Sequence, residues 1–348
     1  MVADYQVNQH QGIAAIRVWE LRKARMKSKV LLSTALALAG IAGASAQTFP
    51  SKPVTIVVPL AAGGAVDTMV RSMIESMRAS LGQPILVENI GGAGGTTGIA
   101  RVARAAPDGY TISVGTWGTH VLNSFVYSPP YDLQKDFETV ALLPNVPQWF
   151  IARKTLPPTN LKELIAWLKA NPGKATSGSV GVGGSSTVCT YYFQKATGTS
   201  YQTVPYRGGA PALQDIVAGN IDMMCDLAAN SLAQVRAGNI KAYAVTSKKR
   251  WFAAPEVPTA DEAGVPGLDI SIWHGAWAPK GTPRDVVVKL NAAFNGAMAD
   301  PNVRKRITDQ GMEFPPREQQ TPQAFAAFLQ GEMEKWGPVV RESGIKAR

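Results

Sequence analysis

A strand, a glycine-rich loop and a helix follow one another near residue 60, and this segment is the one best suited to chemistry. The apolar run Val54–Val58 ends at Pro59, and Gly63-Gly64 precede a helical pattern. Adjacent glycines let backbone N–H groups approach a ligand with no Cβ in the way. The start of the following helix carries partial positive charge. The loop Ala61–Gly64 therefore predicts a site for a small anion.

A second loop of the same kind follows a strand pattern at residues 175–180. It reads Gly181-Val182-Gly183-Gly184-Ser185-Ser186, and a helical pattern comes after it. Hydroxyl groups at a helix start either cap the helix or donate to a bound anion, and both roles are open for Ser185 and Ser186. Two such loops that face each other would form a cleft lined by backbone donors.

Polar and aromatic residues near other strand ends are further candidates. Asp67 is either a cap for the first helix or a ligand contact. Tyr206-Arg207-Gly208 offers a charge-assisted contact, with a solvated arginine as the simpler interpretation. Asp226, at the end of a short strand, either orients a loop or accepts a hydrogen bond from a ligand hydroxyl or ammonium. Trp117 and Trp149 either line a cleft or pack in the core.

The sequence lacks the motifs of common enzyme classes. There is no G-x-x-x-x-G-K-[ST] phosphate loop, and G-x-G-x-x-G fails because Thr97 and Ser186 stand at its last position. No G-x-S-x-G nucleophile motif and no C-x-x-C occur. His120 and His274 are interpreted as hydrogen-bonded structural residues. We therefore expect a binding protein with no cofactor and no metal, and an exported enzyme is the weakest alternative.

The first 46 residues have the organisation of a secretory signal peptide. Two lysines precede the apolar run Val30–Ile41, and Ala44-Ser45-Ala46 follows it. The run is shorter than the roughly 20 residues that a bilayer-spanning helix needs. We expect residues 26–46 to be removed by cleavage after Ala46, and residues 1–25 to be an upstream extension. The mature protein would then be exported to the periplasm.

Charge and cysteine content narrow the possible partners. Six of the 35 Lys and Arg residues and two of the 25 Asp and Glu residues lie in residues 1–46, which leaves a net charge of +6 after cleavage. This mild positive balance suits an anionic ligand. The basic residues form no stripe or module typical of nucleic-acid binding. Cys189 and Cys225 lie in a chain expected in an oxidising compartment, where a disulfide and two free buried thiols are both open.

Strand and helix patterns alternate along the chain, which indicates an α/β fold with parallel βαβ units. Strand patterns cover residues 53–58, 85–89 and 110–115, with helical patterns at 66–81 and 99–105 between them. The alternation recurs after about residue 151, and the C-terminal part is mostly helical in pattern. Ligands of open α/β sheets bind at the carboxyl ends of the strands, so we expect the two glycine-rich loops to share one site.

Short motifs follow one another in a specific order over residues 48–348. They include Leu81-Gly82-Gln83-Pro84, Pro107-Asp108-Gly109-Tyr110-Thr111, Val204-Pro205-Tyr206-Arg207-Gly208 and Gly264-Val265-Pro266-Gly267. Together they resemble the solute receptors of tripartite tricarboxylate transporters, the Bug-type periplasmic binding proteins. The resemblance implies a type II periplasmic-binding-protein fold with a ligand cleft between two α/β domains. Domain 1 would comprise residues 47–151 and 275–348, and domain 2 residues 152–274.

The resemblance also implies a function. The protein would be a monomeric periplasmic receptor that captures a small di-, tri- or aromatic carboxylate and delivers it to membrane permease subunits. The alternative is a periplasmic carboxylate sensor that partners a signalling receptor. Backbone N–H groups and waters would hold the ligand. The resemblance implies contacts from the loops Ala61–Gly64 and Ser179–Ser186. With the candidates named above, the expected ligand contacts are Ala61, Ala62, Gly63, Gly64, Asp67, Thr116, Trp117, Ser179, Gly181, Gly183, Gly184, Ser185, Ser186, Tyr206, Arg207, Gly208 and Asp226.

Some positions depart from the pattern usual in this family. Ala62 stands where proline is common, Arg207 replaces a usual lysine, and Cys225 takes the place of an aromatic residue. Trp117 is unusually bulky for the loop after the third strand. We hypothesise that Trp117 and Trp149 favour an aromatic or bulky carboxylate over citrate.

Overall fold

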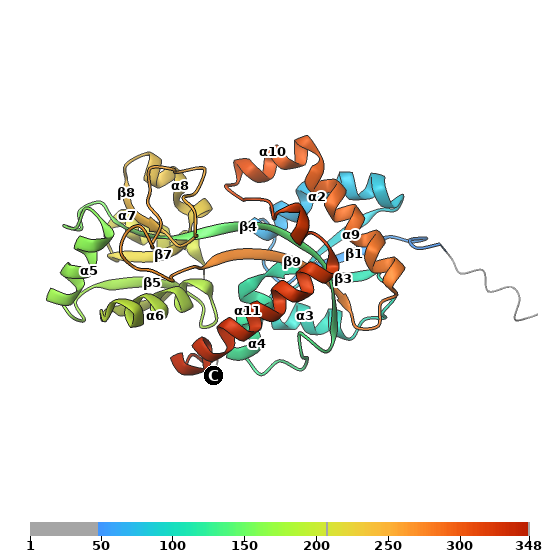
Figure 1. Ribbon diagram of the computed structural model, residues 1–348, viewed down its shortest axis with the longest axis horizontal. Coiled ribbons are helices and arrows are strands. Elements are labelled where there is room, and N and C mark those ends of the chain that lie inside the picture. The colour runs from blue at the N-terminus through green and yellow to red at the C-terminus, as the bar shows by residue number, and fades with distance from the viewer. Residues whose placement is uncertain (1–47, 207, 347–348) are drawn as a thin grey trace, which may run out of the picture. The chain divides into compact units, whose positions relative to one another are not determined.

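Two groups of βαβ units, joined by two long strands, make up most of the part of the chain that the structure describes (Figure 1). The structure is a computed structural model that describes residues 48–206 and 208–346. The expected signal peptide and Arg207 lie outside these ranges. The chain divides into one unit that ends at Ser51 and another that begins at Lys52. All the elements below belong to the second unit.

The first group contains three parallel strands in the order β2-β1-β3. Its helices connect each strand to the next, as the alternating pattern predicts. The apolar faces of β1 and α2 meet in a core where Ile56, Met69 and Met73 are fully buried. The elements are β1 (Val54–Val58), α2 (Ala65–Leu81), β2 (Ile85–Asn89), η1 (Ala93–Gly95), α3 (Thr96–Ala103), β3 (Thr111–Thr116), η2 (Gly118–Leu122) and α4 (Asn123–Val126).

The second group repeats this arrangement with three parallel strands in the order β7-β5-β6. A separate core forms around the fully buried Trp149 and Trp251. The elements are α5 (Leu161–Ala170), β5 (Thr176–Val180), α6 (Ser185–Thr197), β6 (Gln202–Tyr206), α7 (Gly209–Ala218), β7 (Met223–Leu227), α8 (Ala228–Arg236) and β8 (Ile240–Val245).

Two long antiparallel strands, β4 (Phe137–Arg153) and β9 (Ser271–Pro279), run side by side between the groups (Figure 1). β9 pairs with β3, while β4 pairs with β9 as far as Pro147. From Gln148 onward β4 pairs with β7 and β8. One strand therefore serves both sheets, and it changes partners close to residue 151, where one domain boundary is expected. The domain boundaries at residues 151 and 274 stay a prediction.

The C-terminal helices return to the first group. α9 (Arg284–Ala299) packs against α2, and α10 (Pro301–Asp309) follows it. After η3 (Arg317–Gln319), α11 (Pro322–Ser343) packs along β4. Trp336 of α11 is buried and meets Trp117 edge to face at 4.8 Å between ring centroids. Trp336 therefore lies on an apolar face of α11 that packs against the first group.

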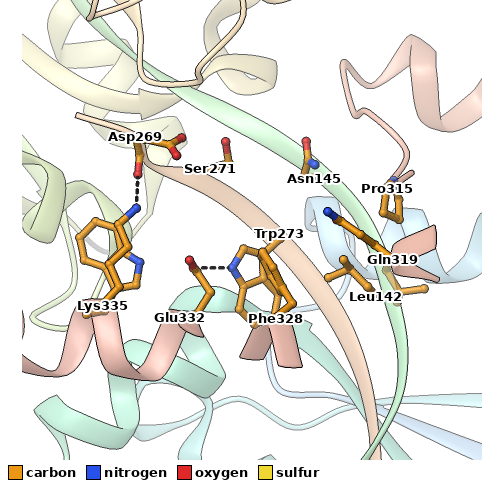
Figure 2. Close-up of a pocket in the computed structure, with 12 residues that line it drawn as sticks. Leu142, Asn145, Asp269, Ser271, Trp273, Pro315, Gln319, Phe328, Glu332 and Lys335 are labelled. Atoms are coloured by element: carbon orange, nitrogen blue, oxygen red, sulfur yellow. Dashed lines mark hydrogen bonds between the residues drawn. The ribbon is translucent and has the colours of Figure 1, made fainter. Parts of the chain in front are cut away.

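A small cavity of about 180 Å³ lies between α11 and the two long strands (Figure 2). Trp273 Nε1 of β9 donates a 2.8 Å hydrogen bond to the Glu332 carboxylate, and Lys335 Nζ donates to the backbone oxygen of Asp269 at 3.1 Å. Burial raises the pKa of Glu332. These contacts hold α11 against β9 where the strands pass from one group to the other.

Candidate functional site

A second cavity, of about 570 Å³, lies where the carboxyl ends of the two groups of parallel strands face each other. Its walls come from loops after β1, β2 and β3, within residues 59–61, 91–95 and 116–127, and from loops after β5, β6 and β7, within residues 180–186, 206–209 and 224–230. Gln148 of β4 and Ile272 of β9 also line it. Its volume is typical of small-molecule sites, and its place is the expected one for an open α/β sheet.

Four helices begin at this cavity without a side-chain cap. The residues that precede α3, α6, α7 and α8 are Gly95, Gly184, Gly208 and Leu227, and none supplies a side-chain hydrogen bond to its helix. Residues at each start line the cavity. First-turn N–H groups have no partner inside a helix, and the helix dipole adds partial positive charge. The backbone therefore forms a site suited to an anion.

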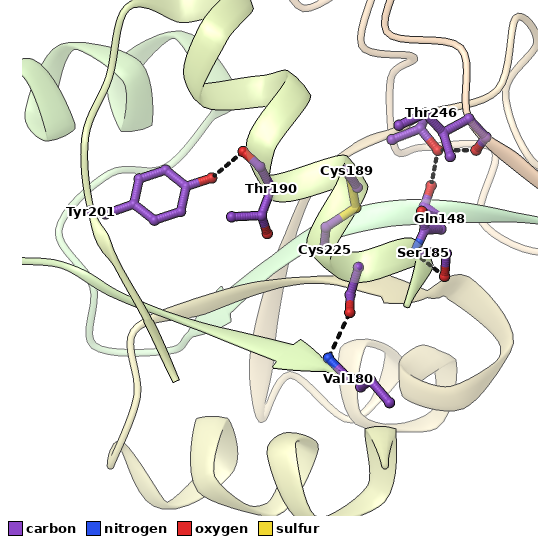
Figure 3. The surroundings of a disulfide bond; sticks show 10 residues. Gln148, Val180, Ser185, Cys189, Thr190, Tyr201, Cys225 and Thr246 are labelled. Atoms are coloured by element: carbon purple, nitrogen blue, oxygen red, sulfur yellow. Dashed lines mark hydrogen bonds between the residues drawn. A yellow bond between two sulfur atoms is a disulfide. The ribbon is translucent and has the colours of Figure 1, made fainter. Parts of the chain in front are cut away.

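The loop between β5 and α6 is folded tightly by its own hydrogen bonds. Val180 N–H donates to Ser186 Oγ at 2.8 Å, and Thr187 Oγ1 donates to the Gly181 oxygen at 2.7 Å. A Cβ at Gly184 would lie 1.7 Å from the Val180 oxygen, so only glycine fits there. Ser186 thus supports the loop, while Ser185 faces the cavity and accepts from Gln148 Nε2 at 3.1 Å (Figure 3).

Two buried amides at the cavity have an oxygen with no hydrogen-bond partner among the described residues: Asn123 Oδ1 and Gln148 Oε1. Asn123 Nδ2 donates to the Gly94 oxygen at 2.5 Å. A Cβ at Gly183 would lie 2.0 Å from Asn123 Oδ1, so this side chain of the first group reaches the loop of the second. The two amides therefore place side-chain oxygen acceptors at the cavity, where the helix starts supply backbone N–H donors.

A disulfide joins Cys189 to Cys225 in the wall that the second group of strands contributes to the cavity (Figure 3). Of the two interpretations left open by the sequence, the structure has the bridge. Cys189 lies on α6 five residues from its start, and Cys225 lies on β7 and lines the cavity. The bridge therefore ties the uncapped helix start to the strand that carries Asp226.

Asp226 is 2 % exposed and lines the cavity at the end of β7. Ser231 Oγ donates to its Oδ2 at 2.6 Å, and Trp149 Nε1 donates to Ser231 Oγ at 2.8 Å. Burial raises the pKa of Asp226 to about 6, although Ser231, Asn230 and the Leu227 N–H lower it in part. The side chain is therefore a buried acceptor beside the helix starts.

The expected ligand contacts divide into two sets. The cavity wall contains Ala61, Thr116, Gly181, Gly183, Gly184, Ser185, Ser186, Tyr206 and Asp226. Residues outside the described wall are Ala62, Gly63, Gly64, Asp67, Trp117, Ser179 and Gly208. Arg207 is not among the described residues, so its expected contact stays a prediction.

Asp67 supports the first loop from behind the wall. Its carboxylate accepts from Gly63 N–H at 2.8 Å, from Arg71 Nε and from Asn89 Nδ2. Burial raises its pKa, but the hydrogen bonds from Arg71, Gly63 and Asn89 together outweigh burial and hold the pKa below its ordinary value. Because Asp67 takes the Gly63 N–H for itself, the loop offers fewer free donors than the sequence suggested.

The two tryptophans expected to select bulky ligands point elsewhere. Trp117 is fully buried against Trp336, and Trp149 is fully buried against Trp251 with its Nε1 on Ser231. Neither lines the cavity. The hypothesis that these rings favour an aromatic carboxylate requires them to line the cleft. That premise is wrong, because both rings fill cores.

Both histidines of the folded part are structural, as interpreted from the sequence. His120 is buried between Ser113 Oγ and Thr119 Oγ1 and stacks on Trp277 at 3.8 Å. Burial lowers its pKa to about 3. His274 is also buried, and its Nδ1 contacts the Pro144 oxygen. Neither ring lines the cavity.

Sequence reasoning missed Asn123, Gln148 and Asn230 at the cavity, together with the glycines at residues 91–95. The glycine run is recognisable in the sequence, but it is not among the expected ligand contacts. Nothing in the sequence around the three amide residues marks them as cavity residues.

Within the described ranges, no helix combines the length and apolarity that crossing a membrane requires.

Relatives in sequence cover nearly the whole chain. An Agrobacterium vitis protein, the UPF0065 protein in the TAR-I ttuE-ttuC' intergenic region, is 39 % identical over 327 residues, 93 % of this chain and 94 % of its own. Protein BugT of Bordetella pertussis is 33 % identical over 90 % of this chain and 96 % of its own.

Solved structures share the fold. The periplasmic binding protein BugD is 40 % identical, with a TM-score of 0.76 over 86 % of this chain and 100 % of its own. MatC from Rhodopseudomonas palustris with bound malate is 41 % identical, with a TM-score of 0.76 over 84 % and 100 %. An R. palustris protein with adipate is 31 % identical, with a TM-score of 0.76 over 86 % and 99 %. The two groups of βαβ units are thus the two α/β domains of a periplasmic binding protein.

The family model described as tripartite tricarboxylate transporter family receptor matches residues 69–345. Residues 69–345 include every segment that lines the cavity except the loop after β1. They also include the starts of α3, α6, α7 and α8. Members of this family are solute-binding receptors rather than enzymes. With the long matches to BugD and MatC, this places the chain in the tripartite tricarboxylate transporter receptor family.

Proposed function

We propose that this protein is a periplasmic receptor that binds a small carboxylate in the 570 Å³ cavity and delivers it to the permease subunits of a tripartite transporter. The observation that carries the proposal is the convergence of four uncapped helix starts on one cavity. The relatives MatC and the R. palustris adipate protein hold dicarboxylates, which supports the same ligand class here.

A carboxylate fits this site better than a phosphate or a nucleotide. The described residues of the wall include no lysine, arginine or histidine, and Arg207, whose contact stays a prediction, would supply one positive charge where a phosphate carries up to two negative charges. Backbone N–H groups at helix starts provide partial charges, which match the single negative charge of each carboxylate. The binding group would thus be held by hydrogen bonds and waters.

Binding can be tested on the exported form that begins after Ala46. The protein would be unfolded and refolded to remove co-purified ligand, and calorimetry would follow titration with succinate, adipate, citrate and benzoate. We expect at least one carboxylate to bind with micromolar affinity or better, and native mass spectrometry of untreated protein to show a carboxylic acid. Binding of sugars or neutral amides but of no carboxylate would contradict the proposal.

Delivery to a permease is distinguished from signalling by transport. A deletion strain should lose uptake of the radiolabelled ligand and regain it when the gene is restored. Normal uptake combined with a lost transcriptional response to the ligand would favour the alternative, a periplasmic sensor. The domain boundaries stay part of this proposal, with residues 47–151 and 275–348 in one domain and 152–274 in the other.

Release and capture require the two domains to move about β4 and β9. The hydrogen bonds from Trp273 to Glu332 of α11 and from Lys335 of α11 to Asp269 lie at this place. We expect small-angle scattering to give a smaller radius of gyration with ligand than without it, and the protein to remain a monomer in both states. An unchanged radius would argue for a rigid site.

A further inference from the structure

Asp226 is out of place in a cavity built for an anion. It is the one described residue of the wall with a formally charged side chain. Little water reaches its side chain, because the residue is only 2 % exposed. A carboxylate so placed repels a second carboxylate, and burying it is unfavourable unless it is hydrogen-bonded. Its presence therefore needs an explanation in terms of its partners.

The two oxygens of Asp226 differ in their contacts. Oδ2 accepts a 2.6 Å hydrogen bond from Ser231 Oγ, which in turn accepts from Trp149 Nε1 at 2.8 Å. Oδ1 accepts a long hydrogen bond, 3.4 Å from Asn230 Nδ2, and the Leu227 N–H also interacts with the carboxylate. An ionised carboxylate has about four lone-pair directions, so Oδ1 keeps acceptor capacity that this weak contact does not fill.

Gly209 leaves the space in front of Oδ1 open. A Cβ at this position would lie 3.4 Å from Asp226 Oδ1 and 2.9 Å from Asn230 Nδ2. All three residues line the cavity. Gly209 is the first residue of α7, and alanine is the better helix former there. Because residue 209 is glycine, none of its atoms beyond the backbone lies between Oδ1 and the cavity, at a position where the helix alone would favour a side chain.

We propose that Asp226 Oδ1 accepts a hydrogen bond from a hydroxyl or ammonium group of the ligand, so that the receptor selects carboxylates that carry such a donor on their carbon skeleton. The inference rests on the proposed carboxylate-binding function. The ligand carboxylate lies at the uncapped helix starts, and its donor group lies against Asp226. A hydroxyl and an ammonium both supply the required N–H or O–H, and the test separates them.

The test uses matched ligand series in which only the donor changes. Calorimetry compares succinate with L-malate and L-aspartate, propionate with L-lactate and L-alanine, and 3-phenylpropionate with L-phenyllactate and L-phenylalanine. In the series that fits the cavity, we expect the hydroxy or amino member to bind at least tenfold more tightly than its parent acid. Equal or tighter binding of the parent would overturn the inference while leaving carboxylate binding intact. Failure of all nine acids to bind while adipate or benzoate binds would overturn the inference alone, and failure of these nine together with adipate, citrate and benzoate would overturn both.

Two variants assign the preference to Asp226. Asp226→Asn keeps an acceptor for Ser231 but loses the charge, and Gly209→Ala covers Oδ1 without altering the carboxylate. Each should reduce binding of the donor-bearing acid tenfold or more and leave the parent acid unchanged or tighter. Asp309→Asn, an equal charge change on the exposed surface of α10, is the control. An unchanged ratio in both variants would overturn the inference, as would an equal loss for every ligand.

Discussion

Helix starts at the cavity differ from those elsewhere in the molecule. Away from the cavity, α5, α10 and α11 begin at Asn160, Asp300 and Thr321, and each side chain accepts a hydrogen bond from its own first turn. At the cavity, α3, α6, α7 and α8 begin without one. Two helices depart from this distinction: α2 and α9 begin after Gly64 and Pro283, have no side-chain cap, and start outside the cavity wall. The N–H groups that the capped helices satisfy internally are thus left for a ligand at the cavity.

The largest expected effect concerns the disulfide beside the uncapped start of α6. Changing both Cys189 and Cys225 to serine should lower the free energy of unfolding by about 3 kcal/mol, because the bridge closes a loop of 36 residues in the unfolded chain. Urea denaturation measures the loss. Hydrogen exchange should rise at α6 and stay unchanged at the capped α10, and an unchanged urea midpoint would contradict the prediction.

A negative charge at an uncapped start should weaken ligand binding strongly. Ser185→Glu places a carboxylate in the first turn of α6, where the helix dipole stabilises it. The same carboxylate should compete with the ligand and weaken its affinity about 100-fold, or about 2.7 kcal/mol. Calorimetry measures this.

The matched control is Asn302→Glu, in the first turn of the capped α10. It should bind ligand like the unaltered protein. A similar loss in both variants would show that overall charge, rather than the uncapped start, is responsible.

Asp226 should make stability depend on pH. Its pKa rises from an ordinary 3.8 to about 6 on folding, so the folded state disfavours the ionised form. This cost is absent below about pH 4, grows between the two values and is complete above pH 6. Asp226→Asn should therefore stabilise the ligand-free protein by about 2 kcal/mol at pH 8.

At pH 4 the same substitution should have little effect. Thermal melts of both proteins at the two pH values measure the difference. A variant that is less stable at pH 8 would show that Asp226 is retained for the fold rather than for the ligand.

The smallest effect is expected at a capped start. Asp300→Ala removes the acceptor of the Asn302 and Val303 N–H groups and should lower stability by about 1 kcal/mol. Ligand affinity should not change, because α10 begins away from the cavity. A weaker affinity in this variant would break the distinction between the two kinds of helix start.

The parallel units could be predicted from the sequence, but the strand that joins them could not. Val54–Val58 and Ile85–Asn89 show short apolar runs bounded by turn residues, and both form strands. β4 contains Pro144 and Pro147, which normally argue against a strand interior. The register of the pairing between β4 and β9 shifts at Pro144, and the Pro144 backbone oxygen contacts the His274 ring. Long-range pairing with β9 therefore overrides the local signal.

The candidate site was predictable where it depends on backbone and unpredictable where it depends on distant side chains. Glycines and serines before α6 mark a helix start from sequence alone, and they line the cavity. Gln148 reaches the cavity only because β4 changes partners at Pro147. Trp149, its neighbour, points the other way into a core, since successive strand residues face opposite sides.

The hydrogen-bond chain from Trp149 through Ser231 to Asp226 makes a buried indole an optical reporter of the cavity. Indole emission responds to the electric field along its ring, and the charge on Asp226 is two hydrogen bonds away. A ligand that neutralises or pairs that charge should shift the emission of Trp149 without touching it. The difference spectrum against Trp149→Phe would isolate this signal, so occupancy could be followed in solution without a dye or a label.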